Sequence, residues 1–174
     1  MPTTLRPLLL ALLLIAAPGY AETLYQVELI VFRQAPPVDA SQPVPEDWAG
    51  AAPAIAAEAR RSPALEDTAR QLNETLGYPV LLHQAWQQAA DDPPRAVRFA
   101  AGTPCDRHAP VEGLLSLRQE RHLELELHTW VNRCDADGFL VASERLQHKR
   151  RLIPGQLTYL DHPSLGALIR VRPR

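Results

Sequence analysis

Two runs of alternating apolar and polar residues, separated by a short charged break, constrain the fold of this chain most strongly. The first covers residues 113–119, the second covers residues 122–132, and Glu120 and Arg121 lie between them. Alternation with a period of two sends successive side chains to opposite faces of a β-strand. One face of the second run is largely apolar and is expected to lie in the core: Leu123, Leu125, Leu127, Thr129 and Val131. The pattern predicts an antiparallel hairpin with one buried face.

Several other segments are also expected to form strands. The most informative covers residues 23–34, because both of its faces become apolar toward its end: Leu29, Ile30, Val31 and Phe32. A strand that is buried on both faces belongs in the interior of a sheet. The other expected strands are residues 80–88, residues 96–101, one or two strands within residues 138–153, and residues 165–174.

One helix is predicted, over about residues 63–76. Ser62 and Pro63 are typical of the N-cap and the first helical position. Apolar residues then recur at helical spacing: Leu65, Ala69, Leu72 and Leu76. Gly77 and Pro79 end the run. Strands in hairpin order with one helix predict an α+β fold, a single domain with a mainly antiparallel sheet and the helix packed on it.

The first 21 residues are typical of a secretory signal peptide. Arg6 precedes a short apolar run, and Gly19 and Ala21 are small residues at the −3 and −1 positions of a cleavage site. The run is too short to span a bilayer, which leaves a membrane anchor as the weaker alternative. The expected product is one exported domain, residues 22–174, in which the proline-rich residues 35–62 form a long, partly extended connection.

Cys105 and Cys134 are the two cysteines of the chain. An even pair in an exported protein predicts a disulfide. Closing a loop of about 30 residues would stabilise the fold by roughly 3 kcal/mol in the chain-entropy model. No third cysteine and no CxxC motif is available for redox or zinc chemistry.

Asp161, His162 and Ser164 are the residue types of a nucleophilic active site. Adjacent residues on a strand point to opposite faces, however, so Asp161 is poorly placed to orient His162. Pro163 and Gly166 indicate a turn, in which an Asp commonly accepts backbone hydrogen bonds. We interpret the segment as a turn and the chain as a non-enzymatic protein without a cofactor. A hydrolase that uses these three residues is the alternative.

A row of potential metal ligands lines the polar face of the second hairpin strand: His122, Glu124, Glu126 and His128. Neighbours on one strand face are about 6.6–6.8 Å apart, so a single ion could use two of them at most. We therefore interpret the row as a solvated face, with metal binding as the alternative.

The charge is unevenly distributed along the chain. The whole sequence has 18 basic and 20 acidic residues, which disfavours nucleic-acid binding. From Val141 onward, seven basic residues stand against two acidic ones. Such asymmetry indicates either a surface for an anionic partner or ordinary solvated strand faces.

Three segments resemble the CsiV family of γ-proteobacterial envelope proteins, in the same order along the chain. They are YQVELIVFRQ at residues 25–34, LGYPVLLHQAWQQ at residues 76–88 and LTYLDHPSLGALIRVRP at residues 157–173. The resemblance implies a periplasmic, non-enzymatic peptidoglycan-binding protein that supports cell-wall synthesis. It also implies a partner, an outer-membrane lipoprotein that activates a class A penicillin-binding protein. Thr158 and Glu124 depart from the family pattern, in which we expect histidines.

The residues expected to contact peptidoglycan come from the basic C-terminal part of the chain. Arginine pairs well with carboxylates such as those of the peptide stems. The predicted ligand-binding residues are Lys149, Arg150, Arg151, Tyr159, Arg170 and Arg172, and no catalytic residue or metal ligand is predicted. An envelope protein that binds only other proteins is the alternative function.

Overall fold

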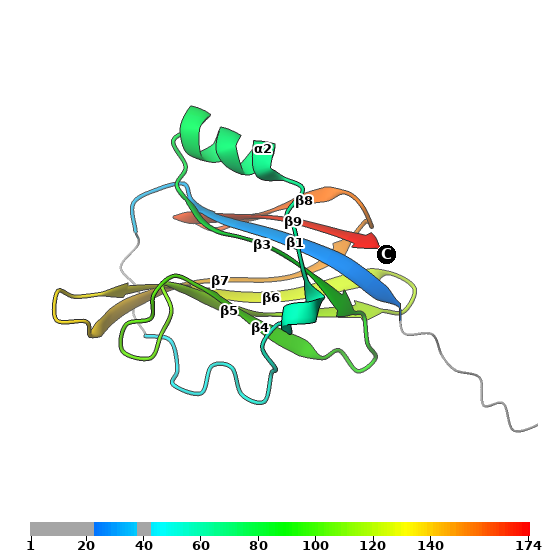
Figure 1. Cartoon of the computed structure of the whole chain (residues 1–174), viewed down its shortest axis with the longest axis horizontal. Helices are drawn as coiled ribbons and strands as arrows, with labels where there is room; N and C mark the ends of the chain where they lie inside the picture. The colour runs from blue at the N-terminus through cyan, green and yellow to red at the C-terminus, as the bar shows by residue number, and fades with distance from the viewer. Residues whose placement is uncertain (1–22, 38–42) are drawn as a thin grey trace, which may run out of the picture.

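The computed structural model describes residues 23–37 and 43–174, and it consists mainly of two antiparallel sheets (Figure 1). The spatial order of the first sheet is β2 (Arg60–Arg61), β3 (Val80–Ala89), β1 (Leu24–Arg33), β9 (Leu165–Pro173) and β8 (Leu157–Asp161). The order of the second is β4 (Ala96–Ala101), β5 (Val111–Gln119), β6 (Leu123–Cys134) and β7 (Leu140–Leu152). The predicted α+β class is confirmed, with two sheets in place of one. The predicted signal peptide lies outside the described residues.

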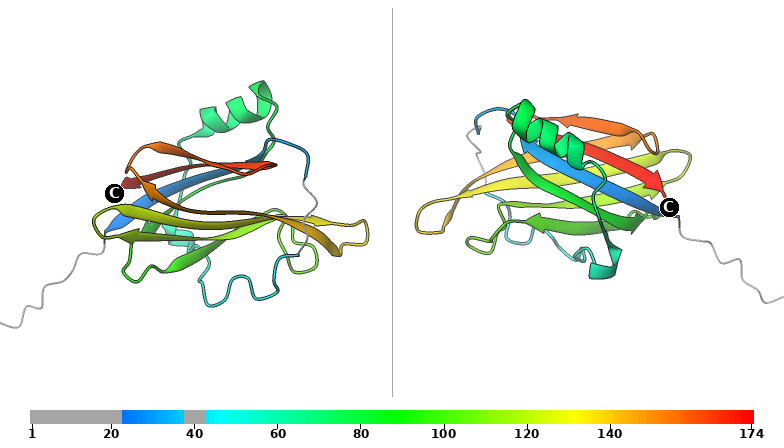
Figure 2. Two further views of the ribbon diagram at one scale, coloured as in Figure 1. Left: turned by 180° about the vertical axis from the view of Figure 1, so that it is seen from behind. Right: turned by 45° about the horizontal axis from the view of Figure 1, so that its top comes forward.

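The main core lies between the two sheets, which stack one above the other in both views of Figure 2. From β6 it receives the predicted row Leu123, Leu125 and Leu127, all of them buried. Trp86 of β3 and Phe99 of β4 meet across the layers with ring centroids 6.2 Å apart. The predicted hairpin and its buried face are therefore confirmed, as β5 and β6.

β1 is the central strand of the five-stranded sheet and is buried on both faces, as predicted. Its outward-facing Ile30 and Phe32 form a second, smaller core with Leu65 and Leu72. These leucines belong to the helical segment, which consists of α2 (Glu66–Arg70) and a π-helical turn, η3 (Gln71–Thr75). The helix thus covers the outer face of the five-stranded sheet (Figure 1).

The predicted start of the helix at Ser62 and Pro63 is wrong. The N-cap is Leu65, whose side chain makes no capping hydrogen bond. The acceptor comes instead from β1, because Oε1 of Glu28 lies 2.7 Å from the Ala64 amide and 2.8 Å from the Leu65 amide. A carboxylate from another element thus binds the amide of the N-cap residue and the amide before it, which fixes the start of the helix against β1.

The proline-rich connection runs along the outer edge of the four-stranded sheet. Ala54 forms a parallel bridge with Arg98 of β4, and Trp48 packs against Trp130 of β6 with ring centroids 5.7 Å apart. Within residues 51–61 the connection forms a 3₁₀ turn, η2 (Ala57–Ala59), which is followed by β2. The small side chains of the alanines in this segment let its backbone lie close to β3 and β4.

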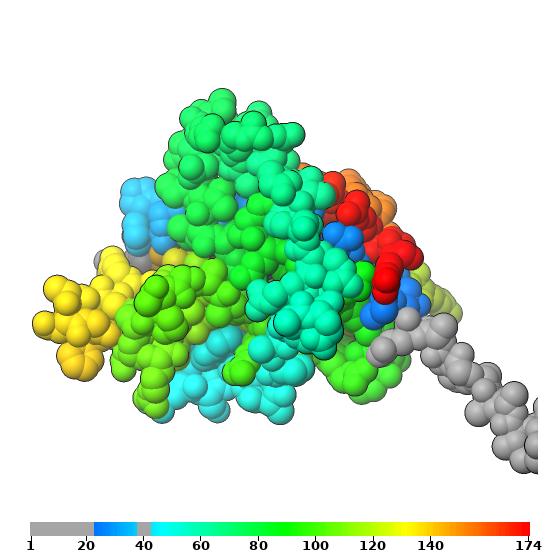
Figure 3. All heavy atoms as spheres, viewed as in Figure 1, coloured from blue at the N-terminus to red at the C-terminus, as the bar shows by residue number. Residues whose placement is uncertain are grey.

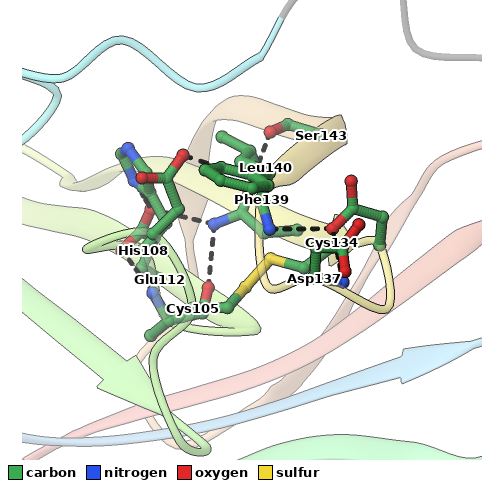
Figure 4. The surroundings of a disulfide bond; sticks show 12 residues. Cys105, His108, Glu112, Cys134, Asp137, Phe139, Leu140 and Ser143 are labelled. Carbon is green, nitrogen blue, oxygen red and sulfur yellow. Dashed lines mark hydrogen bonds and ion pairs between the residues drawn. A yellow bond between two sulfur atoms is a disulfide. The ribbon is translucent and has the colours of Figure 1, made fainter.

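The predicted disulfide between Cys105 and Cys134 is confirmed, with a Cα–Cα distance of 6.6 Å (Figure 4). It ties the loop before β5 to the end of β6. Beside it, the buried carboxylate of Glu112 lies 2.7 Å from Nδ1 of His108 and accepts hydrogen bonds from Ala109 and Asn132.

Among the described residues, no helix has the length and apolar character needed to cross a membrane.

Candidate functional site

The predicted basic residues are divided between the two outer faces of the sandwich. Lys149 and Arg151 pair with Glu126 and Glu124 in the β6–β7 register, which places them on the outer face of the four-stranded sheet. Arg150 pairs with Leu125, a residue whose side chain points toward the core. Arg150 is nevertheless exposed, because β7 is an edge strand of its sheet. The remaining three predicted residues lie on the outer face of the five-stranded sheet: Tyr159, Arg170 and Arg172.

Arg170 forms an ion pair with Glu28, the carboxylate that binds the amides at the start of the helix. Its guanidinium lies 3.0 Å from Oε2 of Glu28, and His83 lies 2.9 Å from the other carboxylate oxygen. Burial by itself would raise the pKa of Glu28, but the hydrogen bonds from His83, from the two amides of the helix start and from Arg170 outweigh it and hold the pKa below its ordinary value. Arg172, two residues further along β9, is exposed.

Tyr159 is held by a small polar network at the corner of the five-stranded sheet. Its hydroxyl lies 2.6 Å from Oδ1 of Asp161 and 2.7 Å from Oε1 of Gln34. The Gln34 amide donates to Asp161 at 3.0 Å and to the carbonyl of His162 at 2.6 Å. The hydrogen bonds from Tyr159 and Gln34 lower the pKa of Asp161, while burial and the Asp161 carboxylate raise the pKa of Tyr159.

Ser164 and His162 lie next to this network. Ser164 is fully buried and its hydroxyl donates to Glu144, whose carboxylate also accepts from Arg33 at 2.6 Å. Nδ1 of His162 is 3.3 Å from the Ser164 hydroxyl, and burial lowers the pKa of this histidine. The Asp161 carboxylate contacts Tyr159 and Gln34 rather than the imidazole. Residues 162–164 thus form a hydrogen-bonded turn between β8 and β9, as predicted, whereas Asp161 is the last residue of β8.

The same corner contains three aromatic rings that sequence reasoning did not bring together. The buried ring of Phe32 lies between Tyr78 and Tyr159, with centroid distances of 5.9 and 6.3 Å and interplanar angles of 22° and 24°. We call these three residues the tyrosine strip. A Cβ at Gly166 would lie 2.3 Å from the Phe32 ring, so the glycine makes room for the strip. The LGYP and YLDHPS segments supplied its only sequence signal, because both belong to the family-like segments.

Two members of the row of potential metal ligands, Glu126 and His128, contact each other, and His128 also contacts neighbouring side chains. His128 stacks on Trp130 with centroids 6.2 Å apart, and its Nδ1 lies 2.9 Å from an Arg145 guanidinium nitrogen. Its other nitrogen is 3.1 Å from Glu126. Within residues 23–37 and 43–174, no group of three or more His, Cys, Asp or Glu side chains is arranged to hold a metal ion.

An apolar groove of about 710 Å³ lies on another part of the molecule, between the proline-rich connection and the strands β3 and β4. Its walls include residues 49–56, the indole of Trp86 and the side chains of Ala89 and Val97. Asp91 and Arg95, which pair at 2.8 Å, also line it. The groove is apolar for most of its lining and is separate from the Tyr159 network.

These features define a two-sheet antiparallel protein with an aromatic and polar corner on the outer face of its five-stranded sheet. The family model described as "Peptidoglycan-binding protein, CsiV" matches residues 5–174, and the chain therefore belongs to the CsiV family. The resemblance of the three sequence segments is thus confirmed. By its description, the family consists of peptidoglycan-binding proteins, which indicates the cell envelope. Neither the curated proteins nor the solved structures include a match to this chain.

Proposed function

We propose that this chain is a non-enzymatic periplasmic protein that binds peptidoglycan through the outer face of its five-stranded sheet and so supports cell-wall synthesis. The observation that carries the proposal is the shared position of Tyr159 and Arg172 on that face. Tyr159 pairs with Leu168 of β9, four residues before Arg172, so the two groups are separated by about 13 Å along the sheet. That surface offers an aromatic contact together with a cation for a stem carboxylate.

The division of the basic residues gives this proposal a matched test. Purified residues 22–174 would be sedimented with isolated sacculi over a salt series, together with the variants Arg172→Glu and Arg151→Glu. Both variants change the charge equally on exposed strand positions, but on opposite faces of the sandwich. We expect Arg172→Glu to weaken binding several-fold and Arg151→Glu to leave it unchanged. The opposite order would assign binding to the other face, and protein that stays in the supernatant at low salt would refute wall binding.

The absence of catalysis is tested at Ser164. Because its hydroxyl is buried and donates to Glu144, we expect Ser164→Ala to retain full sacculus binding. We also expect neither the wild type nor the variant to release soluble fragments from sacculi. Release by the wild type that disappears in a folded Ser164→Ala or His162→Ala protein would establish the hydrolase alternative instead.

The apolar groove favours a second candidate function, in which the protein binds other envelope proteins. We propose that the groove receives an outer-membrane lipoprotein that activates a class A penicillin-binding protein, the partner implied by the family resemblance. Ala96 lines the groove at the start of β4, and Ala96→Glu would place a charge on this apolar wall. Loss of lipoprotein capture with sacculus binding retained would support the assignment. Capture that is unaffected by Ala96→Glu would refute it.

A further inference from the structure

We infer that the tyrosine strip binds the glycan backbone of peptidoglycan, by stacking of neutral amino-sugar rings, and not the charged peptide stems. This inference rests on the proposed function, because it specifies which part of peptidoglycan contacts the face of the five-stranded sheet. It is carried by three observations on the strip: its exposed aromatic surface, the charge beside it and the rigidity of its rings.

The exposed surface of the strip is largely aromatic. Tyr78 and Tyr159 are 36% and 44% exposed, whereas Phe32 between them is 3% exposed. Leu76, which lies two residues before Tyr78 in the chain, is 53% exposed. A pyranose ring has one face composed mainly of C–H bonds, which packs against an aromatic ring while its hydroxyls stay at the edge. Tyrosines suit such a ligand because each combines a flat apolar body with a polar tip.

The charge at the strip selects against peptide stems. Asp161 is exposed beside Tyr159, and its hydrogen bonds with Tyr159 and Gln34 lower its pKa, so it is ionised at neutral pH. Both of these hydrogen bonds use Oδ1 of Asp161. A carboxylate oxygen accepts strongly from sugar hydroxyls and acetamido N–H groups. The same negative charge repels the carboxylates of a peptide stem, which belong nearer to Arg172.

Two of the three rings are held in position by contacts within the protein. The Tyr159 hydroxyl is held by Gln34 and Asp161, and the Phe32 ring lies against Gly166. Little side-chain entropy is therefore lost when a sugar stacks on the strip, which favours binding of a weakly interacting neutral ligand. Phe139 serves as the control for an exposed aromatic residue outside the strip. It is 62% exposed and lies in the β6–β7 turn, which projects from the body of the molecule in Figure 3.

The test compares three probes: intact sacculi, N-acetylglucosamine oligomers that serve as neutral glycan strands, and soluble stem peptides. Binding of the mature protein and of Tyr159→Ala, Tyr78→Ala, Tyr159→Phe and Phe139→Ala would be measured by titration, with ¹⁵N chemical-shift changes to locate the contact. We expect glycan strands to bind and to shift the amides around residues 78 and 159. We expect each tyrosine-to-alanine variant to weaken glycan binding about tenfold, consistent with loss of one stacked ring. Tyr159→Phe should weaken glycan binding less than Tyr159→Ala does, and Phe139→Ala should leave glycan binding unchanged.

The outcomes separate this inference from the proposed function. Sacculus binding together with stem-peptide binding and no glycan binding would overturn the inference and leave the proposed function standing. Failure to bind any sacculi would remove both. Glycan binding that Tyr159→Ala and Tyr78→Ala leave unchanged, with both variants folded by circular dichroism, would show that the sugar contacts another surface and would also overturn the inference.

Discussion

Replacement of Glu28 by glutamine is expected to destabilise the whole fold, because one buried carboxylate joins three elements. Its two oxygens receive the amides of Ala64 and Leu65, the ring of His83 and the guanidinium of Arg170. Glutamine has one oxygen in place of two, and its NH₂ group would face donors. We expect the free energy of unfolding to fall by about 3 kcal/mol, as when one partner of a buried charged network is removed.

The pH dependence gives the same prediction a second readout. The fold lowers the pKa of Glu28 below its ordinary value of 4.5, so its contribution is complete above the unfolded pKa. The contribution is lost as the pH falls through the lower pKa of the folded state. The difference in stability between the wild type and Glu28→Gln should therefore be largest near neutral pH and should shrink below about pH 4.5.

Urea denaturation followed by circular dichroism, at a series of pH values, measures both effects. Glu126→Gln is the matched control, because this glutamate is half exposed on the outer face of the other sheet and its loss should change stability by less than about 0.5 kcal/mol. A cost below about 1 kcal/mol for Glu28→Gln at neutral pH, or a difference that grows in acid, would refute the assignment of Glu28 as the acceptor that docks the helix.

Three further predictions concern stability away from Glu28. Removal of the disulfide by replacing Cys105 and Cys134 with serine should lower the free energy of unfolding by roughly 3 kcal/mol, and an unchanged urea midpoint would contradict this. The buried Thr129 hydroxyl has no hydrogen-bond partner among the described residues, so Thr129→Val should stabilise the protein by about 1 kcal/mol, and a loss of stability would show a missed partner. Gly166→Ala should cost about 1–3 kcal/mol through contact with Phe32, and it should also weaken sacculus binding; a neutral effect on stability would show that the ring moves freely.

Local patterns were sufficient to predict most of the individual elements. The alternation in residues 122–132 predicted the buried face of β6, and the apolar character of both faces in residues 23–34 predicted the central position of β1. These predictions succeed because side-chain direction in a strand depends only on residue parity. The disulfide was also predictable, since the two cysteines of the chain leave only one intramolecular pairing.

Contacts between distant parts of the chain decided the rest. The segment Leu157–Asp161 was not expected to be a strand, and it becomes β8 through its pairing with β9. The helix begins later than its sequence suggests, and a carboxylate more than 30 residues away in the chain binds the two backbone amides just before it. No local pattern contains such partners.

The candidate site shows the same division most clearly. The sequence by itself determined that basic residues are concentrated in the C-terminal part, and it led to Tyr159 through the family resemblance. Only the tertiary structure separated Arg151 from Arg172 on opposite faces and brought Tyr78 beside Phe32. The physical reason is that residue parity orients a side chain relative to its own strand, whereas sheet pairing and layer packing decide which strand faces which, and these depend on the whole chain at once.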